Sequence, residues 1–163
     1  EIMDGLVGSE MCIRDRLLSD FIIATPETRF IEVFARRGLV VDFSGSWILP
    51  RIIGVQKAKE LMMTATEING TTLNDYGVLY KLVEKPDLDS ELDNLVSLLD
   101  KQSFISICMI KDQIRKGLNT NFDESLSNET DNQNSRFVHS DVMEGMSAFV
   151  EKRQPNYKNT LDE

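Results

Sequence analysis

Residues 36–54, RRGLVVDFSGSWILPRIIG, decide how this chain folds. Gly38 and Gly45 enclose a short segment, and glycines at such positions commonly mark a turn. The segment is mostly apolar, and Asp42 is the acidic residue within it. The stretch therefore predicts a tight turn that presents one carboxylate immediately before an apolar helix.

The apolar helix is predicted from side chains that recur at helical spacing. These are Trp47, Ile48, Leu49, Ile52 and Ile53, and we expect them in the core. Pro50 is tolerated near the start of a helix, and Gly54 can end one. Residues 55–65 predict a second, amphipathic helix, whose apolar face consists of Ala58, Leu61, Met62 and Ala65.

Short extended segments are predicted on both sides of these helices. Residues 21–25 lead into Pro26, which forces a turn, and residues 29–33 then resume an extended run. Residues 78–83 predict a strand, because Val78, Tyr80 and Leu82 occupy alternate positions. Residues 1–16 have weak periodicity and look like translated adaptor sequence, so we interpret them as a foreign or artefactual leader. On that interpretation the chain has lost its natural beginning.

The C-terminal half is predicted to be helical from residue 86 onward. Capping residues and apolar spacing predict helices at about 87–99, 103–116, 119–136 and 140–152. The third of these is polar and is expected to be solvated, whereas the last should bury Val142, Met146, Phe149 and Val150. The predicted domains are therefore residues 17–85, an α/β core, and residues 86–163, a helical region.

Composition excludes several classes of function. The chain has 163 residues and a net charge of −9, and its Lys and Arg side chains form no stripe, so nucleic acid is a poor partner. Its apolar runs are far too short to span a membrane. Two cysteines and one histidine, without ligand spacing, disfavour a metal site and a disulfide framework. Nothing resembles a secretory signal, so we expect a cytoplasmic protein.

Four segments in the same order resemble the C-terminal half of the crotonase family, the enoyl-CoA hydratases and isomerases. Residues 36–54 are similar to the family pattern G-L-x-P-D-x-G-x-x-x-L-P-R-x-x-G, with Val41 where proline is common. Residues 141–158, DVMEGMSAFVEKRQPNYK, resemble the closing pattern E-G-x-x-A-F-x-E-K-R-x-P. The other two segments are 17–30 and 57–84. The resemblance implies the C-terminal part of a crotonase-like α/β spiral fold, with short strands followed by a helical trimerisation region.

The resemblance also implies where the chemistry lies. Hydratases of this family use a second glutamate at the position that Phe34 occupies here, and phenylalanine cannot transfer a proton. Isomerase-like members carry an acidic residue at the position of Asp42, which becomes the candidate catalytic base. Neighbouring apolar side chains, Val40, Phe43 and Trp47 among them, would raise the pKa of its carboxyl group. The alternative is that Asp42 only caps a turn or a helix.

Phe149 and Lys152 lie one helical turn apart in a segment that approaches coenzyme A in the family, so they are candidate substrate-binding residues. The simpler alternative is that Phe149 packs in the core and Lys152 pairs with a carboxylate. His139 is expected to be a solvated or capping residue. No separate cofactor or metal is expected, because coenzyme A is part of the substrate.

The leading hypothesis is an acyl-CoA isomerase that transfers a proton through a thioester enolate. One alternative is a hydratase with an unorthodox acid/base, and another is a non-catalytic fragment that only assembles oligomers. The resemblance implies a homotrimer or a dimer of trimers for the complete protein. The family's two backbone N–H donors to the enolate are not visible in this sequence, so the chain alone is expected to be nearly inactive.

Overall fold

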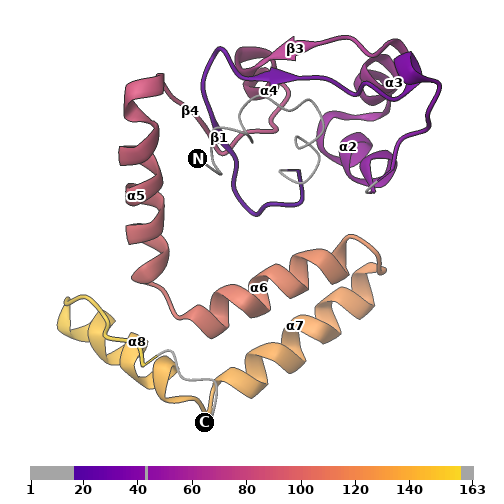
Figure 1. Cartoon of the computed structure of the whole chain (residues 1–163). Helices are drawn as coiled ribbons and strands as arrows, with labels where there is room; N and C mark the ends of the chain where they lie inside the picture. The colour runs from indigo at the N-terminus through magenta and orange to yellow at the C-terminus, as the bar shows by residue number, and fades with distance from the viewer. Residues whose placement is uncertain (1–16, 43, 159–163) are drawn as a thin grey trace. The chain divides into compact units, whose positions relative to one another are not determined.

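The structure, a computed structural model, describes residues 17–42 and 44–158. The chain divides into two compact units between Leu92 and Asp93. Short strands and helices alternate in the first unit, whereas the second is helical (Figure 1). The α/β class and the helical C-terminal half agree with the expectation from sequence. The predicted limits 17–85 and 86–163 stay a prediction, and the leader at 1–16 lies outside the described residues.

The strands of the first unit are very short and form two separate pairs. Their bounds are Ile23–Ala24 for β1, Arg29–Phe30 for β2, Ile68–Asn69 for β3 and Lys81–Leu82 for β4. β1 pairs in parallel with β4, and β2 pairs antiparallel with β3. The predicted extended runs are therefore only partly strands, because the chain turns into a 3-10 helix at Ala35–Arg37 soon after β2.

Three helices complete the first unit and build its apolar core. They are α2 (Gly45–Ile53), α3 (Val55–Thr64) and α4 (Gly70–Asp75). α2 and α3 pack against each other, and the side chains of Phe30, Leu49 and Leu61 are almost completely buried. The other buried members of this core are Leu17, Ile48, Ile53, Ala58 and Leu73. The predicted apolar faces of both helices are thus confirmed at most positions.

Two expectations about α2 are wrong. The helix begins at Gly45, before the apolar stripe, so Pro50 lies inside the helix rather than near its start. The ring nitrogen of Pro50 has no hydrogen and cannot donate to the carbonyl one turn earlier. Trp47 and Ile52 are each 38% exposed rather than in the core, and the guanidinium of Arg51 lies 4.0 Å from the centre of the Trp47 ring. This cation–π contact covers part of the indole from solvent.

Gly70 marks the closest backbone approach in the first unit. Its N–H donates to the carbonyl of Pro26 at 3.2 Å, which ties α4 to the turn between β1 and β2. A Cβ atom at this position would lie 1.9 Å from the carbonyl oxygen of Thr25. Glycine is therefore required here by space rather than by its backbone angles.

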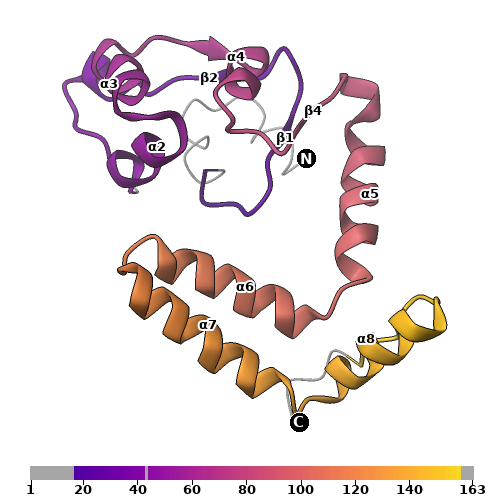
Figure 2. The same ribbon diagram turned by 180° about the vertical axis from the view of Figure 1, so that it is seen from behind.

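The second unit contains three long helices that follow α5 (Leu88–Asp100), which itself crosses the boundary between the units. These are α6 (Phe104–Gly117), α7 (Phe122–Arg136) and α8 (Ser140–Glu151). α6 and α7 lie side by side in both views (Figures 1 and 2). The side chain of Asn121 caps α7 by accepting the N–H of Glu124 at 3.0 Å. All four helices therefore lie within two or three residues of their predicted bounds.

The predicted burial of the last helix is wrong. Ala148 and Asp141 are its buried residues and Val142 is half-buried, whereas Met146, Phe149 and Val150 are 56%, 84% and 79% exposed. The face of α8 that packs within this unit is held by polar contacts, described below. Its apolar stripe therefore faces outward within this single chain.

Candidate functional site

Asp42 lies on an exposed loop between the 3-10 helix Ala35–Arg37 and α2. The backbone carbonyl of Asp42 accepts a hydrogen bond from the N–H of Gly45 at 2.9 Å. The N-cap of α2 is Ser44, which has a left-handed backbone (φ 61°) and makes no side-chain capping bond. The backbone of Asp42 thus shapes the turn, and its carboxylate is presented immediately before the helix.

The apolar wall predicted around Asp42 is not closed within the described chain. Val40 is 86% exposed and Trp47 is 38% exposed, while Val41 is half-buried. Phe43, the remaining predicted member, lies outside the described residues. The aromatic ring of Trp47 is occupied on one side by Arg51. The assignment of Asp42 as a base stays a prediction.

Phe34 is buried, with only 7% of its surface exposed, so an apolar side chain fills the position that the resemblance assigns to a second glutamate. Glu32 is buried even more completely, at 1% exposure, between buried Ile31 and half-buried Val33. The sequence did not predict this burial. No periodic signal in so short a run distinguishes a buried carboxylate from a solvated one.

The structure brings Phe149 and Lys152 together at the C-terminal end of α8. Lys152 is the C-cap and has a left-handed backbone (φ 55°), and its N–H donates to the carbonyls of Ala148 and Phe149. Both side chains are exposed. The alternative in which Phe149 packs in the core of this chain is therefore wrong. Asp42 belongs to the first unit and these two residues to the second.

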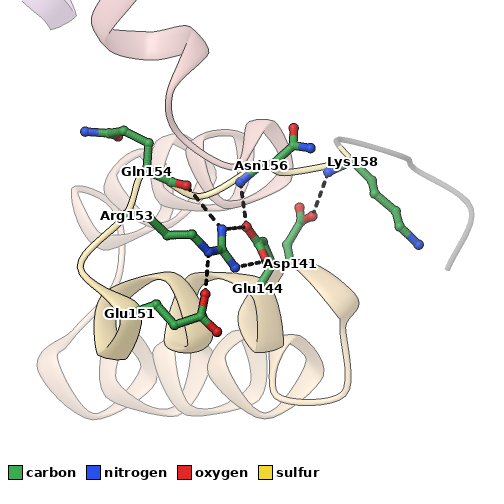
Figure 3. A network of polar contacts seen from close by, with 7 residues as sticks. All are labelled: Asp141, Glu144, Glu151, Arg153, Gln154, Asn156 and Lys158. Atoms are coloured by element: carbon green, nitrogen blue, oxygen red, sulfur yellow. Dashed lines mark hydrogen bonds and ion pairs between the residues drawn. The ribbon is translucent and has the colours of Figure 1, made fainter.

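An exposed charge network holds the segment after α8 against that helix (Figure 3). The guanidinium of Arg153 contacts both carboxylate oxygens of Glu144, at 2.5 and 2.9 Å, and donates to Glu151 at 2.6 Å. Glu144 also accepts the backbone N–H of Asn156 at 2.7 Å. The hydrogen bond from Arg153, followed by that from Asn156, lowers the pKa of Glu144 to about 2.

A second, buried polar cluster lies where α6, α7 and α8 approach each other, and sequence reasoning missed most of it. The carboxylate of Asp141 accepts the Ser103 hydroxyl at 2.8 Å and the Lys158 N–H at 3.2 Å. Arg136 Nη2 lies 3.7 Å from the same carboxylate. His139 caps α8, since its Nδ1 accepts the N–H of Asp141 at 3.1 Å. The predicted capping role is confirmed, but His139 is buried rather than solvated.

Metal-ligating side chains do not gather anywhere in the part of the chain that the structure describes. None of the helices described is long and apolar enough to cross a membrane. The features that stand out are therefore the loop carboxylate of Asp42 and the exposed end of α8.

These two features lie in segments that match known proteins. A sequence model described as enoyl-CoA hydratase/isomerase matches residues 14–160. The chain belongs to this family. Its membership confirms the resemblance drawn from the four sequence segments.

Relatives within the enoyl-CoA hydratase/isomerase family include both reaction types. The trans-2-decenoyl-[acyl-carrier-protein] isomerase of Streptococcus mutans is 33% identical over 139 residues, which cover 85% of this chain and 53% of the relative. The crotonyl-CoA hydratase of Syntrophomonas wolfei is 30% identical over 138 residues, again 85% and 53%. The chain thus spans about half the length of the curated relatives it matches.

Solved structures of this family share the fold. The enoyl-CoA hydratase of Bacillus anthracis superposes with a TM-score of 0.85 at 27% identity, covering 88% of this chain and 56% of that one. The enoyl-CoA hydratase of Polaromonas gives 0.84 at 29% identity, covering 89% and 56%. The expectation of a crotonase-like fold is therefore confirmed.

Proposed function

We propose that this chain is part of an isomerase that shifts a double bond in an acyl thioester. The carboxylate of Asp42 removes a proton from a carbon that the thioester makes acidic, which leaves an enolate. The same carboxyl group then returns that proton to another carbon of the conjugated system, so no group is added or lost. One base suffices for both steps.

The observation that carries this proposal is the contrast between Asp42 and Phe34. An acidic side chain stands on the exposed loop before α2, whereas a buried phenylalanine stands at the position that the family resemblance assigns to the second glutamate of hydratases. Addition of water by two glutamates needs an acid and a base at once, and Phe34 can be neither. The relatives include hydratases as well, so water addition by an unorthodox acid/base remains the second reaction to test.

The exposed end of α8 supports a role in binding the coenzyme A part of the substrate. Phe149 offers an aromatic face that can stack on a base, and Lys152 offers a cation that can meet a phosphate. On this proposal coenzyme A enters as part of the substrate and no separate cofactor is needed. The outward apolar stripe of α8 favours assembly into a homotrimer or a dimer of trimers.

The full reaction is proposed for a protein of the relatives' length, and the chain alone is expected to turn over little substrate. A chimera provides the test: residues 17–158 replace the matching part of the Streptococcus mutans isomerase. The purified chimera is given a 3-enoyl thioester and, separately, a 2-enoyl thioester. We expect the double bond to move in the first and no water to be added to the second.

Asp42→Asn in this chimera should lower kcat by about 100-fold or more, the usual range for losing a general base. Asp75→Asn is the matched control, because Asp75 is an exposed aspartate at the end of α4. Isomerisation that survives Asp42→Asn would show that Asp42 is not the base. Water uptake by the 2-enoyl thioester would instead favour the hydratase reaction.

A further inference from the structure

His139 has an unusual combination of burial and bonding. It is the only histidine in the sequence, and its side chain is 4% exposed at the N-cap of α8. Two groups approach its Nδ1 atom: the N–H of Asp141 at 3.1 Å and Nη2 of Arg136 at 3.1 Å. A backbone N–H and a guanidinium can only donate. Nδ1 must therefore be the acceptor, so the ring is neutral with its proton on Nε2.

We propose that His139 is a protonation-controlled N-cap that fastens the start of α8 only while its ring is neutral. A proton taken from water by Nδ1 turns this atom from an acceptor into a donor. The N–H of Asp141 and Nη2 of Arg136 then both lose their acceptor in a buried place. Acid is therefore the signal that would release this cap.

The groups that face His139 make the protonated ring hard to accommodate. Arg136, at the end of α7, would place a guanidinium against an imidazolium. The carboxylate of Asp141 lies 3.9 Å from Nδ1, which is too far for a hydrogen bond, and it is held in place by the hydroxyl of Ser103, the uncharged group contributed by the start of α6. Among the described residues Nε2 is buried without a hydrogen-bond partner, so it offers the ring no alternative anchor.

Loss of this cap would also affect the C-terminal segment, residues 153–158. The carboxylate of Asp141 accepts the N–H of Lys158, and Glu144, one turn later on α8, accepts the N–H of Asn156. Both carboxylates belong to the part of α8 that His139 caps (Figure 3). When the first turn of α8 opens, one or both of these carboxylates move, and residues 153–158 lose the hydrogen bonds that they make with them.

The test uses the 163-residue chain and nuclear magnetic resonance. With a single histidine, the ring nitrogen signals are assigned without ambiguity. At about pH 8 we expect the tautomer with its proton on Nε2. Between about pH 8 and 5, the exchange protection factors of the Asp141 and Val142 amides should fall about fivefold, the effect of losing one N-cap.

His139→Asn is the matched control, because asparagine caps helices well and does not titrate in this range. In this variant the same two protection factors should change less than about twofold. A proton found on Nδ1 at the higher pH would overturn the proposal. Protection factors of these two amides that acid leaves unchanged in the unaltered chain would also overturn it. So would an equal fall in His139→Asn, because that result would assign the change to carboxylates.

Discussion

The two units of this chain bury different kinds of side chain. In the first unit Phe30, Leu49 and Leu61 are almost completely enclosed by other apolar residues. In the second unit Ser103, His139 and Asp141 are buried, and the apolar residues buried with them are Leu95 and Ala148. The first unit is therefore stabilised mainly by an apolar core, and the second depends more on buried hydrogen bonds.

This difference shows what an apolar stripe can and cannot indicate. The stripes of α2 and α3 close on each other, whereas α8 exposes most of its stripe within the chain. The periodicity is equally clear in both cases. An apolar stripe indicates that one face of the helix will be buried. Only the structure shows whether another part of the same chain buries it.

The largest effect is expected from Leu49→Ala, which tests the apolar core. Leu49 is 0% exposed, so truncation leaves a cavity among Phe30, Leu61 and their neighbours. The free energy of unfolding should fall by about 2–5 kcal/mol, measured by denaturant titration and by amide exchange in α2 and α3. Ile52→Ala on the same helix is the control, because Ile52 is 38% exposed and should cost far less. Equal losses in the two variants would show that the core is not centred on Leu49.

Gly70→Ala should have the next largest effect. The new methyl group would lie 1.9 Å from the carbonyl oxygen of Thr25, so backbone must move. Overpacking of this kind costs about 1–3 kcal/mol and occasionally more, which a shift in the thermal midpoint would report. Thr71→Ala, at an exposed position of the same helix, is the control. A Gly70→Ala protein as stable as the control would disprove the close approach of α4 to the β1–β2 turn.

Asp141→Asn tests the buried polar cluster. The amide has the shape of the carboxylate but can accept through only one oxygen, so either the Ser103 hydroxyl hydrogen or the Lys158 N–H loses its acceptor. A buried polar group left unsatisfied costs about 1–3 kcal/mol. The amide exchange rates of α6 and α8 should rise accordingly. Asp131→Asn, on exposed α7 surface, is the control. No change in Asp141→Asn would mean that the second unit does not depend on this cluster.

Local sequence signals predict the helices of this protein well. The 3, 4 and 7 spacing in α3 acts between near neighbours, so one sequence suffices to find it. The strands are predicted less well. Each contains two residues, and their pairing joins Ile23 to Lys81 and Phe30 to Ile68, which no local rule specifies.

The candidate site divides in the same way. The motif around Asp42 identifies the carboxylate and the helix that follows it, because both lie within one short segment. The burial of Glu32 and the cluster around Asp141 depend on contacts between distant segments; Ser103 and Asp141 are 38 residues apart in the chain. Such contacts become visible only when the chain is folded.

The smallest effect is expected at Glu144, which tests the exposed network of the second unit. The pKa of Glu144 is lowered to about 2 from 4.5 by Arg153, so folding favours the ionised carboxylate. The stability that Glu144 contributes is present above pH 4.5 and is lost as the pH falls from there toward 2. Between these pH values, exchange protection of the Asn156 amide should fall in the unaltered chain and stay flat in Glu144→Gln. Because the pair is exposed, water and salt screen it, and added salt should shrink the difference. Glu129→Gln should keep the pH dependence of the unaltered chain, and its loss there would assign the effect to general charge rather than to the contact between Glu144 and Arg153.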